Sequence, residues 1–370
     1  MNAAATRCAA HTLRCAAGTC VAARPVRCAA GTCVDAKPVG AMSLRARGGL
    51  PRSRQQKRQY GWTIVELVIA TGLGLVLTLL ASGLLLAGSG SYRSHSENTW
   101  INDGGRYALE IMSQAIRQGG YVNWDSDEAP AELEDDEPAS IAGLDASSIS
   151  KTSDGIEGQL PAVANGSDVL ALRFAGYGAG ANGDGSSLNC AGFGVGAPSA
   201  AIARGWSIFY VTTDAGGEPE LRCKYRSAAG WGADAIVRGV DSFQVLYGID
   251  TDLPGDGIPN KFVNASAINA MDAGLVLVGV TPDQLRRDLN RKTNWKSVCS
   301  VKLALLLRGE SNTRSDAVAR QFDLFGAAYA DGHGGDLGVR VAESIFPETQ
   351  RWRTRRAFGM TVALRNRSIL

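Results

Sequence analysis

The most apolar part of the chain is an almost unbroken run over residues 62–88. Its polar members are one carboxylate, Glu66, and a few threonine and serine hydroxyls. At about 1.5 Å per residue, a helix over this run would span roughly 40 Å, which exceeds the ~30 Å hydrocarbon core of a bilayer. The pattern therefore predicts one membrane-spanning helix. An ionised side chain in lipid costs at least ~2.5 kcal/mol, so the position of Glu66 needs a reason.

Apolar positions continue at helical spacing over residues 89–120. The Asn-Asp-Gly-Gly cluster at residues 102–105 has low helix propensity and predicts a kink or an interruption there. Gly119 and Gly120 predict the end of the helix. We therefore expect an amphipathic helical half that lies on an outer domain. The apolar stripe that would face this domain consists of Tyr92, Ile101, Ala108, Ile111, Met112, Ala115 and Ile116.

Residues 121–370 alternate between short apolar strands and loops. Apolar side chains occupy every second position in "VCSVKLALLLR" and "RRAFGMTVALR", as in a strand with one buried face. Further short strands are predicted in "DVLALRF", "WSIFYVTT", "ELRCKY" and "FQVLY". Residues 125–165 and 178–200 are acidic or rich in small residues, and we expect surface loops there. Several strands after one long helix predict an α+β fold, with the helix packed on an antiparallel sheet.

The amino-terminal end differs in composition from the rest. It carries a tandem repeat, "RCAAGTCVAARPV" followed by "RCAAGTCVDAKPV", which holds most of the cysteines that precede Met42. Cysteine pairs spaced in this way indicate either a metal or redox site or a translated upstream sequence. No histidine or acid cluster accompanies the thiols, which favours the second interpretation. We therefore interpret residues 1–41 as an upstream extension and residues 42–61 as a basic leader.

Charge is nearly balanced over the whole chain, at +2, and argues neither for nor against a nucleic-acid partner. Its distribution is uneven, because residues 43–60 contain five arginines and one lysine but no acid. A basic leader before a membrane helix stays in the cytoplasm, which would leave the remainder outside. An ordinary secretory signal would have a small-residue cleavage pattern after the apolar run, and none is present.

The order of residues around Gly61 resembles the class III signal of type IV pilins and type II secretion pseudopilins. "GWTIVELVIA" follows the family's G-F-T-[LI]-[IV]-E, with Trp62 where the family usually has Phe. The resemblance implies that a prepilin peptidase cuts after Gly61 and that the new amino group of Trp62 is methylated. It also implies that Glu66 neutralises the amino terminus of a neighbouring subunit during assembly. Opposite charges attract far more strongly in a low-dielectric helix bundle than in water.

Further stretches narrow the resemblance to PilW-type minor pilins: "SYRSHSENTWINDGGRYALEIMSQAIRQGGY", "VRGVDSFQVLYGIDTD", "VKLALLLRGE" and "RRAFGMTVALRNR". It implies a structural subunit that takes part in priming and assembly of type IV pili, and hence in twitching motility and adhesion. It implies a single-pass inner-membrane protein with a periplasmic domain that later joins the fibre at the cell surface. The implied partners are other minor pilins, the major pilin, the prepilin peptidase, the inner-membrane assembly platform and membrane lipid.

Three cysteines follow the leader: Cys190, Cys223 and Cys299. An outward-facing domain lies in an oxidising space, so we expect a disulfide. A bond between Cys190 and Cys223 would close a loop of about 30 residues and stabilise the fold by roughly 3 to 4 kcal/mol on the chain-entropy model. We favour this pair, with Cys299 as a buried thiol on its apolar strand face. Spacing alone does not determine connectivity, so the other pairings stay open.

The stretch "GIDTDLPGDGIPN" places Asp250, Asp252 and Asp256 around two glycines. Carboxylates clustered on a turn supply the hard oxygen ligands that calcium prefers. The Leu-Pro pair interrupts the D-x-D-x-D-G spacing of calcium loops, and no glutamate lies twelve positions after Asp250. The preferred interpretation is therefore an Asp/Gly-rich hairpin loop, with a structural calcium site as the alternative. Apart from this alternative we expect no cofactor.

Enzymatic functions lack their motifs, since the chain has no H-E-x-x-H, no G-x-S-x-G and no Walker loop. After the leader only His95 and His333 remain, and we expect no enzyme. Two alternatives to a minor pilin stay open: a minor pseudopilin of type II secretion, and an adhesive or DNA-binding module at a fibre tip. The arginines of "QRWRTRRAFGM" could contact phosphates. Solvated arginines at the start of a strand are the preferred interpretation, and nucleic acid is not an expected partner.

Overall fold

The computed structural model describes residues 61–122, 135–198, 204–314 and 316–366. The upstream extension, residues 1–41, and the leader up to residue 60 lie outside the described residues. Contacts divide the chain into two units after Glu66, and the larger unit begins at Leu67. Its helices are α1 (Ile64–Gln118, which begins just before this unit), α2 (Ala265–Ala273), α3 (Pro282–Lys292), α4 (Ala327–Gly332) and α5 (Glu348–Arg351).

The strands follow α1 in sequence, with two short 3-10 turns, η2 (Asn294–Ser297) and η3 (Glu343–Ile345), among them. They are β1 (Ile141–Leu144), β2 (Ser147–Ile149), β3 (Gln159–Pro161), β4 (Val169–Phe174), β5 (Gly205–Thr213), β6 (Pro219–Ser227), β7 (Gly230–Arg238), β8 (Val240–Ile249), β9 (Lys261–Val263), β10 (Val298–Arg308), β11 (Gln321–Asp323), β12 (Arg340–Ala342) and β13 (Arg355–Ala363).

The strands form two main antiparallel sheets, where the sequence had indicated one. The first has the order β1-β4-β5-β6-β7 and the second the order β13-β10-β8-β9. The chain passes from one sheet to the other through Gly239, which stands between β7 and β8 with φ +72°. A side chain there would lie 2.7 Å from the carbonyl oxygen of Arg308, so only glycine fits this crossing. The predicted α+β class with antiparallel strands is confirmed, and the strands divide at this residue.

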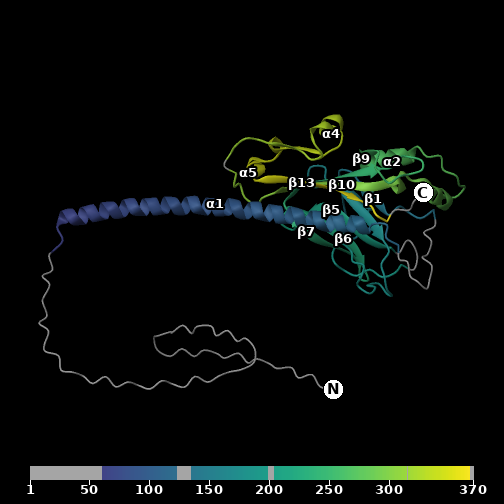
Figure 1. Ribbon diagram of the computed structural model, residues 1–370, viewed down its shortest axis with the longest axis horizontal. Coiled ribbons are helices and arrows are strands. Elements are labelled where there is room, and N and C mark those ends of the chain that lie inside the picture. Colours follow the sequence, from purple (N-terminus) through teal and green to yellow (C-terminus); the bar gives the residue numbers. More distant parts are fainter. Residues whose placement is uncertain (1–60, 123–134, 199–203, 315, 367–370) are drawn as a thin grey trace, which may run out of the picture. The chain divides into compact units, whose positions relative to one another are not determined.

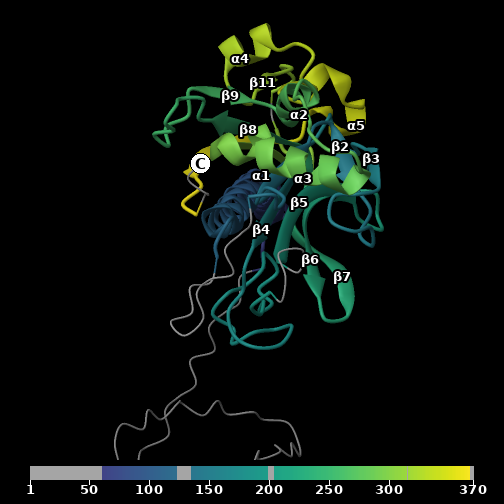
Figure 2. The same ribbon diagram turned by 90° about the vertical axis from the view of Figure 1, so that its right-hand side faces the viewer.

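Helix α1 packs against both sheets along its second half (Figures 1 and 2). Its buried side chains join those of both sheets in one hydrophobic core. The predicted kink or interruption at residues 102–105 is wrong, because the helix continues through them. A Cβ at Gly105 would lie 2.5 Å from the ring of Phe358 on β13, and one at Gly104 would lie 2.9 Å from Val237 on β7. The two glycines let the helix approach both sheets, and this packing outweighs their low propensity of about 1 kcal/mol each.

The loops predicted over residues 125–165 are only partly correct. This stretch contains β1, which pairs with β4 at the edge of the first sheet, and the small β2–β3 pair. Its acidic and small-residue composition indicated a loop, but pairing with β4, whose residues are buried except for Arg173, overrides that local preference. Helices α2 and α3 and strand β7 were also not predicted. The described part of residues 178–200 is a loop that carries Cys190.

Candidate assembly site

The amino-terminal end of α1 is closed by a reciprocal pair of side chains. The Thr63 hydroxyl accepts a hydrogen bond from the Glu66 backbone N–H at 3.3 Å, and Glu66 Oε2 accepts one from the Thr63 backbone N–H at 3.0 Å. The Thr63 hydroxyl also donates to Oε2 at 3.0 Å. This is a capping box, which satisfies donors that the first helical turn leaves without a partner. Glu66 therefore has a role within its own helix that the sequence analysis missed, although the T-x-x-E spacing was its signal.

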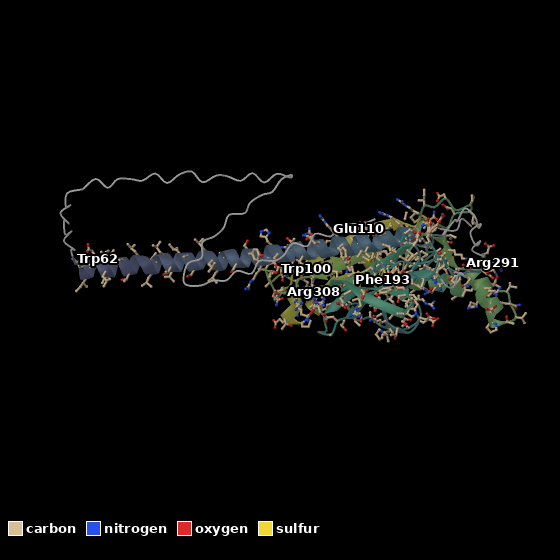
Figure 3. All side chains as sticks on the ribbon, turned by 90° about the horizontal axis from the view of Figure 1, so that it is seen from below. Trp62, Trp100, Glu110, Phe193, Arg291 and Arg308 are labelled. Carbon is tan, nitrogen blue, oxygen red and sulfur yellow. A yellow bond between two sulfur atoms is a disulfide. The ribbon has the colours of Figure 1, made fainter. Side chains whose placement is uncertain are left out.

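The first half of α1 exposes its apolar side chains. From Ile64 to Leu86 the large aliphatic residues are more than half exposed, and Trp62 is 80% exposed. Figure 3 shows these side chains projecting outward along the helix. By length and composition alone, α1 is the one helix of the described residues that could cross a membrane. Its apolar surface needs a cover that the domain does not supply, because burial of apolar area is the main favourable term in folding and association.

The disulfide joins the loop of residues 178–198 to β6. Cys190 and Cys223 are bonded, with their Cα atoms 5.9 Å apart, and this is the pair that the sequence analysis favoured. The backbone N–H of Cys190 also donates to the Ser207 hydroxyl on β5 at 3.0 Å. Cys299 is a buried thiol on β10, and its Sγ donates to the carbonyl of Gly248 at 3.4 Å.

The acidic loop brings its three predicted carboxylates together. Ligand oxygens of Asp250, Asp252 and Asp256 lie within 4.8 Å of one another, Asp250 buried and the other two exposed. Asp250 Oδ2 accepts from the Gly257 backbone N–H at 2.6 Å, and Asp252 Oδ2 accepts from the Asn260 side-chain amide at 3.0 Å. These bonds build the turn without an ion, and the same oxygens are of the type that calcium binds. Calcium binding stays a prediction.

The arginines of "QRWRTRRAFGM" were expected to be solvated at the start of a strand. This prediction is wrong for Arg355. Arg355 has no exposed side-chain surface; its Nε donates to Asp241 at 2.6 Å. Arg308, labelled in Figure 3, donates to the other oxygen of Asp241 at 2.8 Å. Burial raises the pKa of Asp241, and the two guanidinium groups oppose that effect. Arg356 is exposed and donates to Asn102 on α1 at 2.6 Å. This arrangement ties β13 to β8, β10 and α1.

The two histidines have no catalytic surroundings among the described residues. His95 lies on the exposed side of α1. His333 follows α4 and stacks on the ring of Tyr329, with centroids 4.0 Å apart. Neither forms a hydrogen bond or ion pair with a carboxylate in the described ranges.

Comparison with known proteins gives a family match in the carboxyl-terminal part of the chain. Residues 208–366 match the family model PilW, described as Type IV Pilus-assembly protein W. The PilW resemblance is confirmed over this segment. The matched PilW segment runs from within β5 to the last described residue and contains the second sheet and the buried arginines. It covers less than half of the chain and does not include α1.

Among solved structures, a type IV-like pilin from Thermus thermophilus is similar at 13% identity. The alignment covers 72% of this chain and 98% of that chain, with a TM-score of 0.33. No curated protein sequence matches the chain.

Proposed function

We propose that this chain is a minor pilin that takes part in priming and assembly of type IV pili. It acts by helix packing rather than by catalysis. A prepilin peptidase cuts after Gly61, Trp62 becomes the methylated amino terminus, and α1 anchors the protein in the inner membrane with its domain in the periplasm. Other minor pilins, the major pilin and the assembly platform then take the place of lipid around α1 as the subunit enters the fibre.

The observation that supports this proposal is the union of two parts in one chain. An exposed apolar helix begins with a carboxylate in its first turn, and it leads into a domain that carries the PilW segment. Such a helix is stable in lipid and equally stable in a bundle of similar helices. Movement from membrane to fibre therefore needs no change in the domain.

Glu66 is proposed to act between subunits as well as within its own helix. Among the described residues only Oε2 accepts the capping bonds, so Oε1 is available to meet the ammonium group of a neighbouring amino terminus. An unpaired carboxylate in lipid is costly, and a partner that brings a positive charge reduces that cost. The capping role needs only an acceptor, whereas the pairing role needs a negative charge.

These two roles separate in three variants. Glu66→Gln keeps an acceptor for the capping box but removes the charge, and Glu66→Ala removes both. Thr63→Val removes the two bonds of the Thr63 hydroxyl but keeps the charge. We expect all three chains to be processed. We expect piliation to fall in Glu66→Gln as much as in Glu66→Ala and to persist in Thr63→Val. Wild-type piliation in Glu66→Gln would contradict the pairing role.

Mass spectrometry of the mature amino terminus tests the proposal as a whole. The expected chain begins at a methylated Trp62, and a chain that begins at Met1 or Met42 would contradict it. A minor pseudopilin of type II secretion would share this processing. Deletion of the gene distinguishes the two functions, because a minor pilin affects piliation and twitching and a pseudopilin affects protein export. The DNA-binding alternative is less favoured, since Arg355, one of the arginines that it needs, is buried and paired.

A further inference from the structure

Residues 275–280, "LVLVGV", connect α2 to α3 and expose a stripe of valines. Val276, Val278 and Val280 are 83%, 71% and 94% exposed, while Leu275 and Leu277 are half-buried. This alternation has the period of two that an extended backbone produces. An apolar stripe of this kind is unusual on a surface far from the membrane span, where polar residues normally face solvent.

Helix α3 holds one backbone edge of this segment. Gln284 Oε1 accepts from the Val280 N–H at 2.8 Å, Asp288 Oδ2 accepts from the Val278 N–H at 2.7 Å, and Lys292 Nζ donates to the Val276 carbonyl at 2.9 Å. The helix side chains in these bonds are four residues apart and the valines are two residues apart. Four residues of helix rise about 6 Å and two residues of extended chain about 6.7 Å, so the two spacings match. The helix and the segment run in opposite directions.

Gly279 makes this close approach possible. A Cβ at that position would lie 2.8 Å from the Cβ of Gln284. The groups on the odd-numbered edge, the N–H and carbonyl of Leu277 and of Gly279, form no hydrogen bond within the described part of the chain. The segment therefore resembles an edge strand that is paired on one side by side chains and open on the other.

We propose that residues 275–280 and α3 form a docking edge for an extended segment of another protein. This segment has apolar side chains at alternate positions and acidic residues at its ends. Strand addition supplies the missing backbone partners and covers the valines. Arg286, Arg287 and Arg291 are each more than half exposed on α3, which has two more basic than acidic side chains. This charge favours an acidic partner over a second copy of the same chain.

The position of the edge agrees with a role in contact between proteins. Figure 2 shows α3 on the face of the domain toward the viewer, and Figure 3 places Arg291 at the opposite end of the domain from Trp100. A lipid surface could also cover valines and bind arginines. It would not supply an ordered row of donors and acceptors for the open backbone, so the structure favours a strand.

The test uses the full chain in detergent and two short peptides in which valine alternates with threonine. One peptide has acidic ends and the other has lysine ends. We expect the acidic peptide to bind about tenfold more tightly at low salt, with the difference reduced by added salt. Reversal of charge in Arg287→Glu with Arg291→Glu should invert this preference.

Leu277→Pro tests the backbone edge, because it removes an outward N–H and leaves the three bonds to α3 in place. We expect Leu277→Pro to lower the affinity for the acidic peptide at least about tenfold, whereas the matched control Leu277→Val should bind it like the wild type. Equal binding of both peptides or binding of neither would overturn the proposal. So would association of two copies through a photo-crosslinker at position 278, or binding to anionic vesicles in preference to the acidic peptide.

Discussion

A guanidinium with no exposed surface needs its counter-charges inside the protein, and Arg355 has them. Its Nε donates to Asp241 at 2.6 Å, and its Nη1 lies 3.5 Å from Glu343, whose side chain is also fully buried. Arg314 donates to the same Glu343. In sequence, Arg355 and Arg356 are equivalent, yet the alternation of β13 sends one into the core and the other outward.

Removal of one member of this network should be far more damaging than removal of its exposed neighbour. We expect Arg355→Met to lower the free energy of unfolding by roughly 3 to 5 kcal/mol, because Asp241 then keeps a buried charge with one partner fewer. The matched control is Arg356→Met, which loses only a surface bond to Asn102 and should unfold like the wild type. Urea unfolding of the two variants in detergent measures the difference, and equal midpoints would contradict this account.

Calcium binding by the acidic loop can be tested by changing only its two exposed carboxylates. If the loop binds calcium, the melting temperature should rise with calcium, by an amount that corresponds to about 2.7 kcal/mol at a hundred times the Kd, and EDTA should reverse it. Asp252→Asn with Asp256→Asn should abolish the shift without unfolding the loop, since Asp250 keeps its bond to Gly257. An identical melting temperature in calcium and EDTA would show that the loop is an Asp/Gly turn that does not bind calcium.

At the scale of elements, α1 shows how tertiary packing selects residues that local propensity disfavours. Gly104 and Gly105 lie where Val237 of β7 and Phe358 of β13 leave no room for a side chain on the helix. Helix α3 shows the reverse case, because its signal is local: Thr281 and Gln284 form a capping box, and Pro282 opens the helix. The sequence "TPDQ" carries this signal, so the start of α3 could have been predicted from the sequence.

A larger residue at the helix crossing should be destabilising. We expect Gly105→Leu to lower stability by roughly 1 to 3 kcal/mol, because the ring of Phe358 must move. Gly90 is the matched control, since a Cβ there meets nothing within 4 Å. Gly90→Ala should be neutral or stabilising by up to about 1 kcal/mol through helix propensity alone. Thermal unfolding of both variants checks the contrast, which a loss in Gly90→Ala would contradict.

The disulfide should stabilise the fold by joining the loop that carries Cys190 to β6. We expect Cys190→Ser with Cys223→Ser to cost about 2 to 4 kcal/mol. Reductant should lower the melting temperature of the wild type and leave the double variant unchanged. A wild type that is insensitive to reductant would mean that the bond contributes nothing to the fold.

At the scale of the whole molecule, the core and the apolar span occupy different halves of one helix. The earliest buried residue of α1 is Ile101, and the others follow it up to Ile116. The side chains before residue 90 are exposed. The domain therefore owes its stability to the second half of α1 and to the sheets, and the first half adds no buried residue to the core.

Truncation should separate the two halves. A chain that begins at residue 91 should be soluble without detergent and unfold cooperatively, because it keeps every buried residue of α1. A chain that begins at residue 119 should not fold, since it lacks α1's contribution to the core. Size-exclusion chromatography and circular dichroism distinguish these outcomes, and a folded domain without α1 would contradict the predicted dependence.

Features that depend on neighbouring residues could be predicted from the amino-acid sequence. The apolar run, the alternating strands β10 and β13 and the turn that gathers three aspartates all follow from periodicity and turn chemistry. The continuity of α1 through residues 102–105, the division into two sheets and the burial of Arg355 could not be predicted in this way. Each of these depends on contacts between residues far apart in the chain, such as Gly105 with Phe358 and Arg355 with Asp241. Local pattern carries no information about such contacts.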